Sequence, residues 1–245
     1  MNASGPIIAA SILTADFGNL FRVVRALEKA GVDRIHLDVM DGHFVPNLTF
    51  GPDVVAAIRR LTRLPLDVHL MIDQPAEFLA AFLRSGADSV TFHVEAPEAE
   101  AVKRESLQRI RNEGRLAGLA ISPGTPVASL MPYTDCLDIA MVMTVVPGAG
   151  GQRFLADEAH KIAEARPAVA SAAAGEIHVD GGVNRDTAGT VGAYGADVLV
   201  VGSALFQRGR DTAAEVDLVR RAARAAARGD DLATGDAATM TAPLR

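Results

Sequence analysis

Residues 29–47 read Lys-Ala-Gly-Val-Asp-Arg-Ile-His-Leu-Asp-Val-Met-Asp-Gly-His-Phe-Val-Pro-Asn, and this stretch carries the pattern from which the fold is predicted. The preceding segment 20–30 has apolar residues at helical spacing, and Gly31 is the residue type that closes a helix in the left-handed conformation. The apolar run 34–39 is typical of a buried strand, and the Gly, Pro and Asn of 41–47 indicate a loop. The stretch therefore predicts a helix, a glycine turn, a strand and a loop in succession.

The same helix-to-strand connection occurs twice more, as Arg84-Ser-Gly-Ala-Asp88 and Ala193-Tyr-Gly-Ala-Asp197. Short apolar runs alternate with helical patterns such as 20–30 and 52–60. Eight such units without a linker favour a single (β/α)8 barrel, the TIM barrel, over residues 1–228, and an open doubly wound sheet is the alternative. The predicted strands are 7–13, 34–39, 66–71, 89–93, 116–121, 139–144, 176–180 and 198–201.

Composition excludes several classes of protein. The net charge of −6 and the lack of a clustered basic face argue against a nucleic-acid partner, and no apolar run reaches the roughly 20 residues of a membrane span. The single cysteine, Cys136, excludes an internal disulfide and a cysteine-rich zinc site. The N-terminal segment 1–6 lacks a secretion signal, so we expect a cytoplasmic protein. Residues 229–245 have no apolar period, and we expect a loosely ordered tail there.

Two residues of the strand 34–39, His36 and Asp38, point to the same face because they are two positions apart. Alone, this pair fits either a metal site or a polar pair on a strand. His69 on strand 66–71 and Asp180 at the end of strand 176–180 would stand at the same end of a barrel. Together the four predict a site for one divalent metal ion, with zinc, iron, manganese and cobalt all compatible.

Asp38 and Asp180 come from opposite sides of the predicted barrel mouth. Placed on two faces of a substrate, they could remove and return a proton, while the metal polarises a carbonyl. This chemistry needs a substrate with an acidic C–H bond beside a ketone. Met40, Met71 and Met143 would line the pocket with polarisable surface, although each could equally be core filler.

Glycines follow three consecutive strands at the same end of the predicted barrel. Loops of this kind bring backbone N–H groups to an anion, and phosphate binding after the last strands is a recurrent use of this barrel. The three loops therefore predict a phosphate site. Its residues are Gly148, Ala149, Gly150 and Gly151, then Gly181 and Gly182, then Gly202 and Ser203.

Several motifs together resemble those of the ribulose-phosphate 3-epimerase family, from about residue 7 to residue 206. They are Ala10-Ser-Ile-Leu-Thr-Ala-Asp-Phe17, His36-Leu-Asp-Val-Met-Asp-Gly-His-Phe-Val-Pro-Asn47, Asp67-Val-His-Leu-Met71, Pro147-Gly-Ala-Gly-Gly-Gln152, Val179-Asp-Gly-Gly-Val183 and Val201-Gly-Ser203.

The resemblance implies a TIM barrel of the ribulose-phosphate-binding type that interconverts D-ribulose 5-phosphate and D-xylulose 5-phosphate with one metal ion per subunit. It implies that His36, Asp38, His69 and Asp180 bind this metal, with Asp38 as proton acceptor and Asp180 as proton donor. It further implies that Ser11, His69 and the glycine loops contact a ketose phosphate and that the protein is a homo-oligomer.

The loop after strand 139–144 departs from the family pattern at Val146 and Ala149, where a polar residue and an aromatic residue are usual. A roomier mouth would suit a longer ketose phosphate such as allulose 6-phosphate, so this substrate stays open, as does a non-catalytic sugar-phosphate-binding barrel. A related decarboxylase would need an Asp-x-Lys-x-x-Asp signature, which is missing. We expect His93 to pack or hydrogen-bond beside the site.

Overall fold

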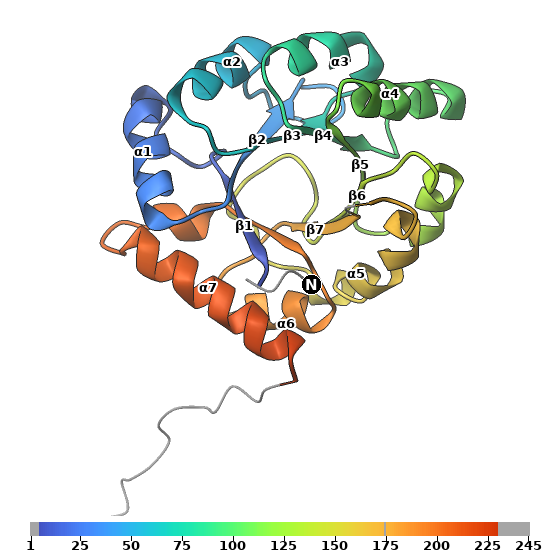
Figure 1. Ribbon diagram of the computed structural model, residues 1–245. Coiled ribbons are helices and arrows are strands. Elements are labelled where there is room, and N and C mark those ends of the chain that lie inside the picture. Colours follow the sequence, from blue (N-terminus) through green and yellow to red (C-terminus); the bar gives the residue numbers. More distant parts are fainter. Residues whose placement is uncertain (1–4, 174, 230–245) are drawn as a thin grey trace, which may run out of the picture.

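The computed structural model describes residues 5–173 and 175–229, which form one closed parallel barrel with helices around it (Figure 1). Each strand pairs with the next in chain order, and β8 closes the barrel against β1. The predicted (β/α)8 barrel is confirmed, and the open doubly wound sheet is wrong because no strand of the described residues is left at an edge. The strands are β1 Ile7–Ser11, β2 Arg34–Met40, β3 Leu66–Met71, β4 Ser89–His93, β5 Leu116–Ile121, β6 Ile139–Met143, β7 Glu176–Asp180 and β8 Val198–Val201.

The helices form the outer ring, in which α7 lies between α6 and α1 (Figure 1). A 3₁₀ helix, Val127–Tyr133, occupies the place of a full α-helix between β5 and β6. The α-helices are α1 Leu20–Ala30, α2 Pro52–Leu61, α3 Pro75–Arg84, α4 Glu100–Asn112, α5 Lys161–Glu164, α6 Ala188–Ala193 and α7 Thr212–Ala227. Of the predicted tail 229–245, all but Gly229 lies outside the described residues.

Three strand boundaries differ from the predicted ones. The strands predicted at 7–13 and 139–144 end at Ser11 and Met143, because the chain turns away after the last residue that pairs with the neighbouring strand. The strand predicted at 34–39 continues to Met40, which pairs with Met71 of β3. Each difference is set by the neighbouring strand, which the local sequence does not reveal.

The first and last residues of the repeated Gly-Ala/Val-Asp connection each have a structural role. Gly31 adopts a φ of 78° and closes α1, the left-handed conformation that glycine adopts without a steric penalty. The aspartate two residues later caps the adjacent strand: Asp33 accepts a hydrogen bond from the backbone N–H of Ile8 at 2.8 Å. Asp88 and Asp197 do the same for Leu66 of β3 and Ile177 of β7. The connection therefore ends a helix and aligns two neighbouring strands.

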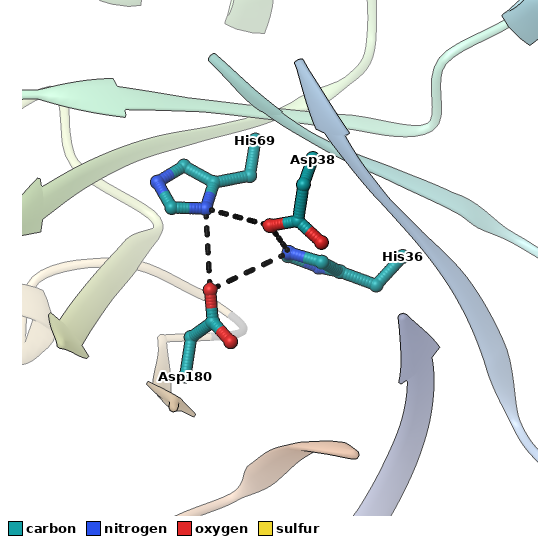
Figure 2. A group of neighbouring side chains, drawn as sticks. All are labelled: His36, Asp38, His69 and Asp180. Carbon is teal, nitrogen blue, oxygen red and sulfur yellow. Dashed lines mark ion pairs between the residues drawn. The ribbon is translucent and has the colours of Figure 1, made fainter. Parts of the chain in front are cut away.

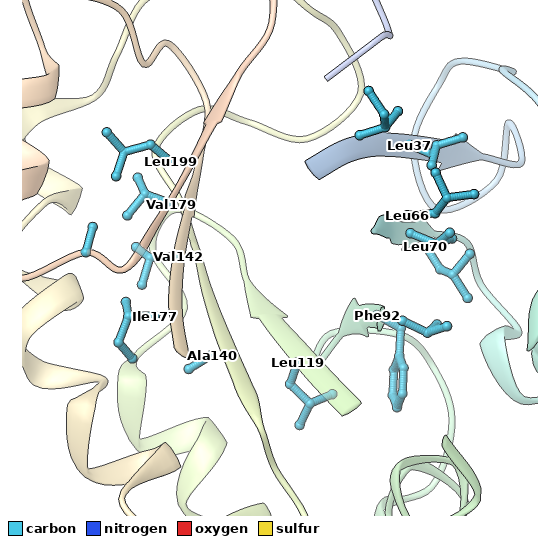
Figure 3. Close-up of a cluster of buried hydrophobic side chains, with 14 of the residues drawn as sticks. Leu37, Leu66, Leu70, Phe92, Leu119, Ala140, Val142, Ile177, Val179 and Leu199 are labelled. Carbon is cyan, nitrogen blue, oxygen red and sulfur yellow. The ribbon is translucent and has the colours of Figure 1, made fainter. Parts of the chain in front are cut away.

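Side chains alternate between two layers along each strand. The outward residues of the strands, such as Leu37, Leu70 and Phe92, are buried against the helices and form the main hydrophobic core (Figure 3). The inward residues of β2, β3, β4 and β7 are largely polar, although the interior of such barrels is usually filled by branched aliphatic side chains. Buried polar groups usually pair with one another, and those that do not call for a functional explanation. The polar interior is therefore the place to look for a functional site.

Candidate active site

The four predicted metal ligands come together at the C-terminal end of the barrel (Figure 2). His36 and Asp38 project from β2, His69 from β3 and Asp180 from the end of β7. One ligand atom from each side chain lies within 4.8 Å of the others. His36 and His69 are fully buried and Asp38 is 3% exposed, so the cluster forms the floor of the mouth.

The spacing of the ligand atoms matches coordination of one ion. Nε2 of His36 lies 3.4 Å from Oδ1 of Asp38 and 3.8 Å from Oδ2 of Asp180. Nδ1 of His69 lies 3.5 Å and 3.3 Å from the same two oxygens. Two atoms bound to one metal at about 2.0–2.2 Å with tetrahedral angles lie about 3.3–3.6 Å apart, whereas an N–H···O bond spans about 2.7–3.2 Å.

Hydrogen bonding agrees with this geometry. Among the described residues, Nε2 of His36 and Nδ1 of His69 are buried and have no hydrogen-bond partner. Buried polar atoms without a partner are uncommon and costly. Both atoms point at the same small space between two carboxylates, so the donor set fits a divalent cation.

The charges of the cluster lead to the same conclusion. Burial by itself would lower the pKa of His36, but the carboxylates of Asp38 and Asp67 raise it well above its ordinary value. Burial by itself would raise the pKa of Asp38, but His36 and His69 lower it. The two carboxylates therefore favour positive charge at this point, and a bound dication can supply that charge.

His36 is oriented by a carboxylate behind it. Its Nδ1 lies 2.8 Å from Oδ2 of Asp67, and Oδ1 of Asp67 accepts a hydrogen bond from Ser89. A carboxylate can only accept, so the hydrogen of a metal-binding His36 lies on Nδ1 and leaves the lone pair on Nε2. Such carboxylate–histidine pairs are a usual feature of metal sites. Asp67 opens one of the motifs quoted above, but the sequence did not indicate this function.

The two aspartates keep further oxygens that the cluster does not use. The hydroxyl of Ser11 donates to Oδ2 of Asp38 at 2.6 Å, while Oδ1 of Asp38 faces the imidazoles. Asp180 directs Oδ2 towards the imidazoles, and its side chain is 13% exposed at the mouth. Each carboxylate can therefore face both a bound cation and a molecule in the mouth.

A pocket opens above this cluster at the mouth of the barrel. Nearly all residues that the sequence predicts for substrate binding line it; His69 is the exception, because it is fully buried. Sequence reasoning assigned no role to Thr14, Gln152 or Val200, which also line the cavity. The predicted residues that line it are Ser11, Met40, Met71, Met143, Gly148, Ala149, Gly150, Gly151, Gly181, Gly182, Gly202 and Ser203, together with Asp38 and Asp180.

The glycine loops require glycine because other segments pass close to them. A Cβ at Gly182 would lie 2.6 Å from the backbone nitrogen of Phe154, and one at Gly150 would lie 2.4 Å from the side chain of Thr14. No described residue accepts a hydrogen bond from the backbone N–H of Gly182, Gly202 or Ser203. Since none of the described residues lining the cavity is Lys or Arg, these N–H groups and hydroxyls such as that of Ser203 are donors that an anion could use.

The loops after β2 and β6 meet beside the mouth. Asn47 donates from Nδ2 to the carbonyl oxygen of Gly148 at 2.9 Å. Gln152 donates to the carbonyl oxygens of Val146 and Ala149, which holds the second loop in a tight turn. Val146, at 61% exposure, points away from the barrel core, so its difference from the family pattern affects the loop surface.

Within the described residues, each helix is too short or too polar to cross a lipid bilayer. Structural similarity is found to 3-hexulose-6-phosphate synthase from Salmonella typhimurium, with a TM-score of 0.68, 17% identity and coverage of 89% of this chain and 98% of that one. At this identity the likeness concerns the fold alone.

Sequence comparison is more specific. The family model described as the ribulose-phosphate 3 epimerase family matches residues 7–206. Ribulose-phosphate 3-epimerase of Bacillus subtilis (strain 168) is 45% identical over 202 residues, which is 81% of this chain and 91% of that protein. The Rhodobacter capsulatus protein of the same name is 44% identical over 224 residues, which is 89% of this chain and 96% of that protein. The chain therefore belongs to the ribulose-phosphate 3-epimerase family, as its motifs predict, and is an isomerase that acts on a carbohydrate.

Proposed function

We propose that the protein interconverts D-ribulose 5-phosphate and D-xylulose 5-phosphate with one divalent metal ion bound by His36, Asp38, His69 and Asp180. The observation that carries this proposal is the cluster itself, in which two imidazole lone-pair positions and two carboxylate oxygens face one point at metal-site spacing. Zinc, iron, manganese and cobalt all suit a donor set of two histidines and two aspartates.

In this proposal the aspartates exchange the proton on C3. Asp38 removes it from one face of the sugar, the electrons move into an enediolate, and Asp180 returns a proton to the opposite face. The roles reverse in the other direction. The hydroxyl of Ser11 keeps Asp38 oriented through its 2.6 Å hydrogen bond. A bound metal supplies positive charge that stabilises the enediolate oxygens.

The phosphate of the substrate would lie over the glycine loops. The unpaired N–H groups of Gly182, Gly202 and Ser203 support this, since they line the cavity that also contains Asp38 and Asp180. Backbone donors recognise a phosphate without a positively charged side chain. Met40, Met71 and Met143 would contact the carbon chain of the sugar between the two ends.

The decisive experiment measures substrate preference and metal content on one sample. We expect the metal-loaded protein to convert ribulose 5-phosphate and, in D₂O, to exchange its C3 proton. A large preference for allulose 6-phosphate in a parallel assay would assign the longer substrate. A metal-loaded protein that exchanges no C3 proton of either compound would be a binding protein and not an enzyme.

Two further proposals concern the whole molecule. Membership of this family leads us to propose a homo-oligomer, which sedimentation velocity would test directly. We also keep the proposal of a cytoplasmic protein, which fractionation of the source cells would test.

A further inference from the structure

A fifth histidine, His93, lies directly behind the proposed metal ligand His69. It is the last residue of β4 and is fully buried. Its ring stacks on that of His69, with centroids 5.0 Å apart and planes at 23°. The ring centroid of Phe44, from the loop after β2, lies 4.8 Å from that of His93. Packing from these rings holds His93 in one orientation, so its two nitrogens have defined neighbours.

The hydrogen bond between the two imidazoles has one possible direction if His69 binds a cation. Nε2 of His69 and Nε2 of His93 are 2.9 Å apart, so only one of them carries a hydrogen. Nδ1 of His69 is the atom that faces the cluster, and a ligating nitrogen carries no hydrogen. The hydrogen of His69 must therefore lie on Nε2 and be donated to His93, whose own hydrogen must then lie on Nδ1.

Glu95 is the next member of this series of hydrogen bonds, which runs from His69 through His93. Its Oε2 lies 3.1 Å from Nδ1 of His93, where it accepts the hydrogen that the imidazole carries there. Its Oε1 accepts the backbone N–H of Ser122 at 2.7 Å, which anchors the carboxylate on the next strand end. The hydroxyl oxygen of Ser122 lies 3.3 Å from the same Nδ1 and can also accept its hydrogen. From Ser122 through Glu95 and His93 to His69, every hydrogen bond therefore has a consistent donor and acceptor.

We propose that Glu95, acting through His93, holds the hydrogen of His69 on Nε2 and thereby presents the Nδ1 lone pair of His69 to the metal. Both are positioning residues, because neither lies at the cluster or lines the cavity. The two imidazoles of the site would then be oriented by different hydrogen-bond partners. His36 contacts its carboxylate, Asp67, directly, whereas His69 reaches Glu95 through a second imidazole. This inference rests on the proposed metal dependence.

The variant Glu95→Gln tests the direction of the series. The backbone N–H of Ser122 requires an acceptor, so the amide oxygen stays on that side and the NH₂ group faces Nδ1 of His93. The NH₂ group donates, so it favours a hydrogen on Nε2 of His93, which opposes the hydrogen on Nε2 of His69. We expect metal affinity to fall by about 10- to 100-fold, the usual effect of removing such an outer partner.

Glu98→Gln is the matched control. Glu98 is three residues away, accepts the backbone N–H of Ala76, and has no hydrogen bond to His93. We expect this variant to bind metal as the wild type does. Similar losses in Glu98→Gln and Glu95→Gln would mean that a general effect on the loop, and not the series, lowers affinity.

A second pair of variants tests His93 itself. His93→Gln keeps an oxygen that can accept from Nε2 of His69, whereas His93→Phe keeps the stacking and removes the acceptor. We expect His93→Gln to retain part of the affinity and His93→Phe to lose more. Equal affinity in these two variants, or a Glu95→Gln affinity within twofold of wild type, would overturn the proposal.

The measurement uses the full chain stripped of metal and titrated with Co²⁺ in competition with a chelator. The visible absorption of bound Co²⁺ reports its coordination geometry, and the melting temperature of each metal-free variant reports folding. If the wild type itself binds no divalent metal, the proposed metal dependence fails and this inference fails with it. If the wild type binds and the variants bind equally well, only this inference fails.

Discussion

The two ends of the barrel interior contain similar residues but differ in how their polar atoms are paired. At the N-terminal end, Arg34 forms two hydrogen bonds of 2.7 and 2.6 Å with Glu176, which also accepts one from His178 at 2.8 Å. At the C-terminal end, the ligand atoms of His36 and His69 have carboxylate oxygens at 3.3–3.8 Å and no hydrogen bond.

This difference separates a structural cluster from a functional one. Buried charges are costly unless they are paired, and Arg34 and Glu176 supply the pairing themselves. The cluster at the mouth directs imidazole nitrogens and carboxylate oxygens at one point, with the ligand atoms within 4.8 Å of one another. His178 lies between the two ends, and its Nδ1, 3.5 Å from Asp67, also has no hydrogen-bond partner among the described residues. The cluster at the mouth differs because it brings two such nitrogens together with two carboxylates. Residue type alone does not distinguish the ends, and the pairing does.

The largest effect is expected from Asp38→Asn, which removes the proposed base while keeping the hydrogen bond from Ser11 possible. We expect turnover of ribulose 5-phosphate to fall by about 10²- to 10⁴-fold or more, with the fold intact by circular dichroism. Glu176→Gln at the other end of the barrel is the control and should retain turnover. Near-normal activity of Asp38→Asn would refute its assignment as the base.

The next largest effects are expected from removing the metal or one of its ligands. We expect chelation to abolish activity, and readdition of metal at about 100 times its dissociation constant to stabilise the fold by about 2.7 kcal/mol. His69→Ala should lose metal on dialysis against chelator, while His160→Ala, an exposed histidine outside the cluster, should keep it. Metal content and melting temperature check both expectations. Equal retention in the two variants would count against His69 as a ligand.

The N-terminal cluster should affect stability and its pH dependence. Burial by itself would raise the pKa of Glu176, but hydrogen bonds from His178 and Arg34 lower it to about 2. Because the folded value lies below the ordinary 4.5, this stabilisation is complete above about pH 4.5 and is lost as the pH falls towards about 2.

Glu176→Gln should therefore unfold more easily at pH 7, by about 2–4 kcal/mol, since it breaks an ion pair that is largely shielded from water. Urea titrations at several pH values would measure this difference, which should shrink between about pH 4.5 and pH 2. A difference that stays constant over this interval would show that the ionisation of Glu176 is not its source.

The smallest effect is expected at the junction of the two loops. Asn47→Ala removes the hydrogen bond to Gly148, and we expect KM to rise several-fold with a smaller change in kcat, because this contact holds a loop of the cavity and involves neither proposed catalytic aspartate. His43→Ala, an exposed position in the same loop, is the control. An unchanged KM in Asn47→Ala would show that this contact does not contribute to substrate binding.

Much of the fold followed from local patterns. The apolar runs and the Gly-Ala/Val-Asp connections predicted the alternating strands and helices, and the structure confirms the connections at Gly31, Gly86 and Gly195, all with positive φ. Strand ends were less predictable, since Ser11 and Met143 end their strands where pairing with a neighbour stops. The sequence also predicted which four side chains would gather, because their strands end at one edge of a closed barrel.

By itself, the sequence determined that His36 and Asp38 share a face and that glycine loops follow the last strands, because these properties depend on side-chain alternation and on residue type. Only the tertiary structure decided which groups stand behind the ligands. Asp67 lies beside His36, His93 stacks on His69, and Arg34 reaches Glu176, a residue 142 positions away. The register of parallel strands and the closure of the barrel bring these residues together, and neither is encoded in the spacing of a single segment.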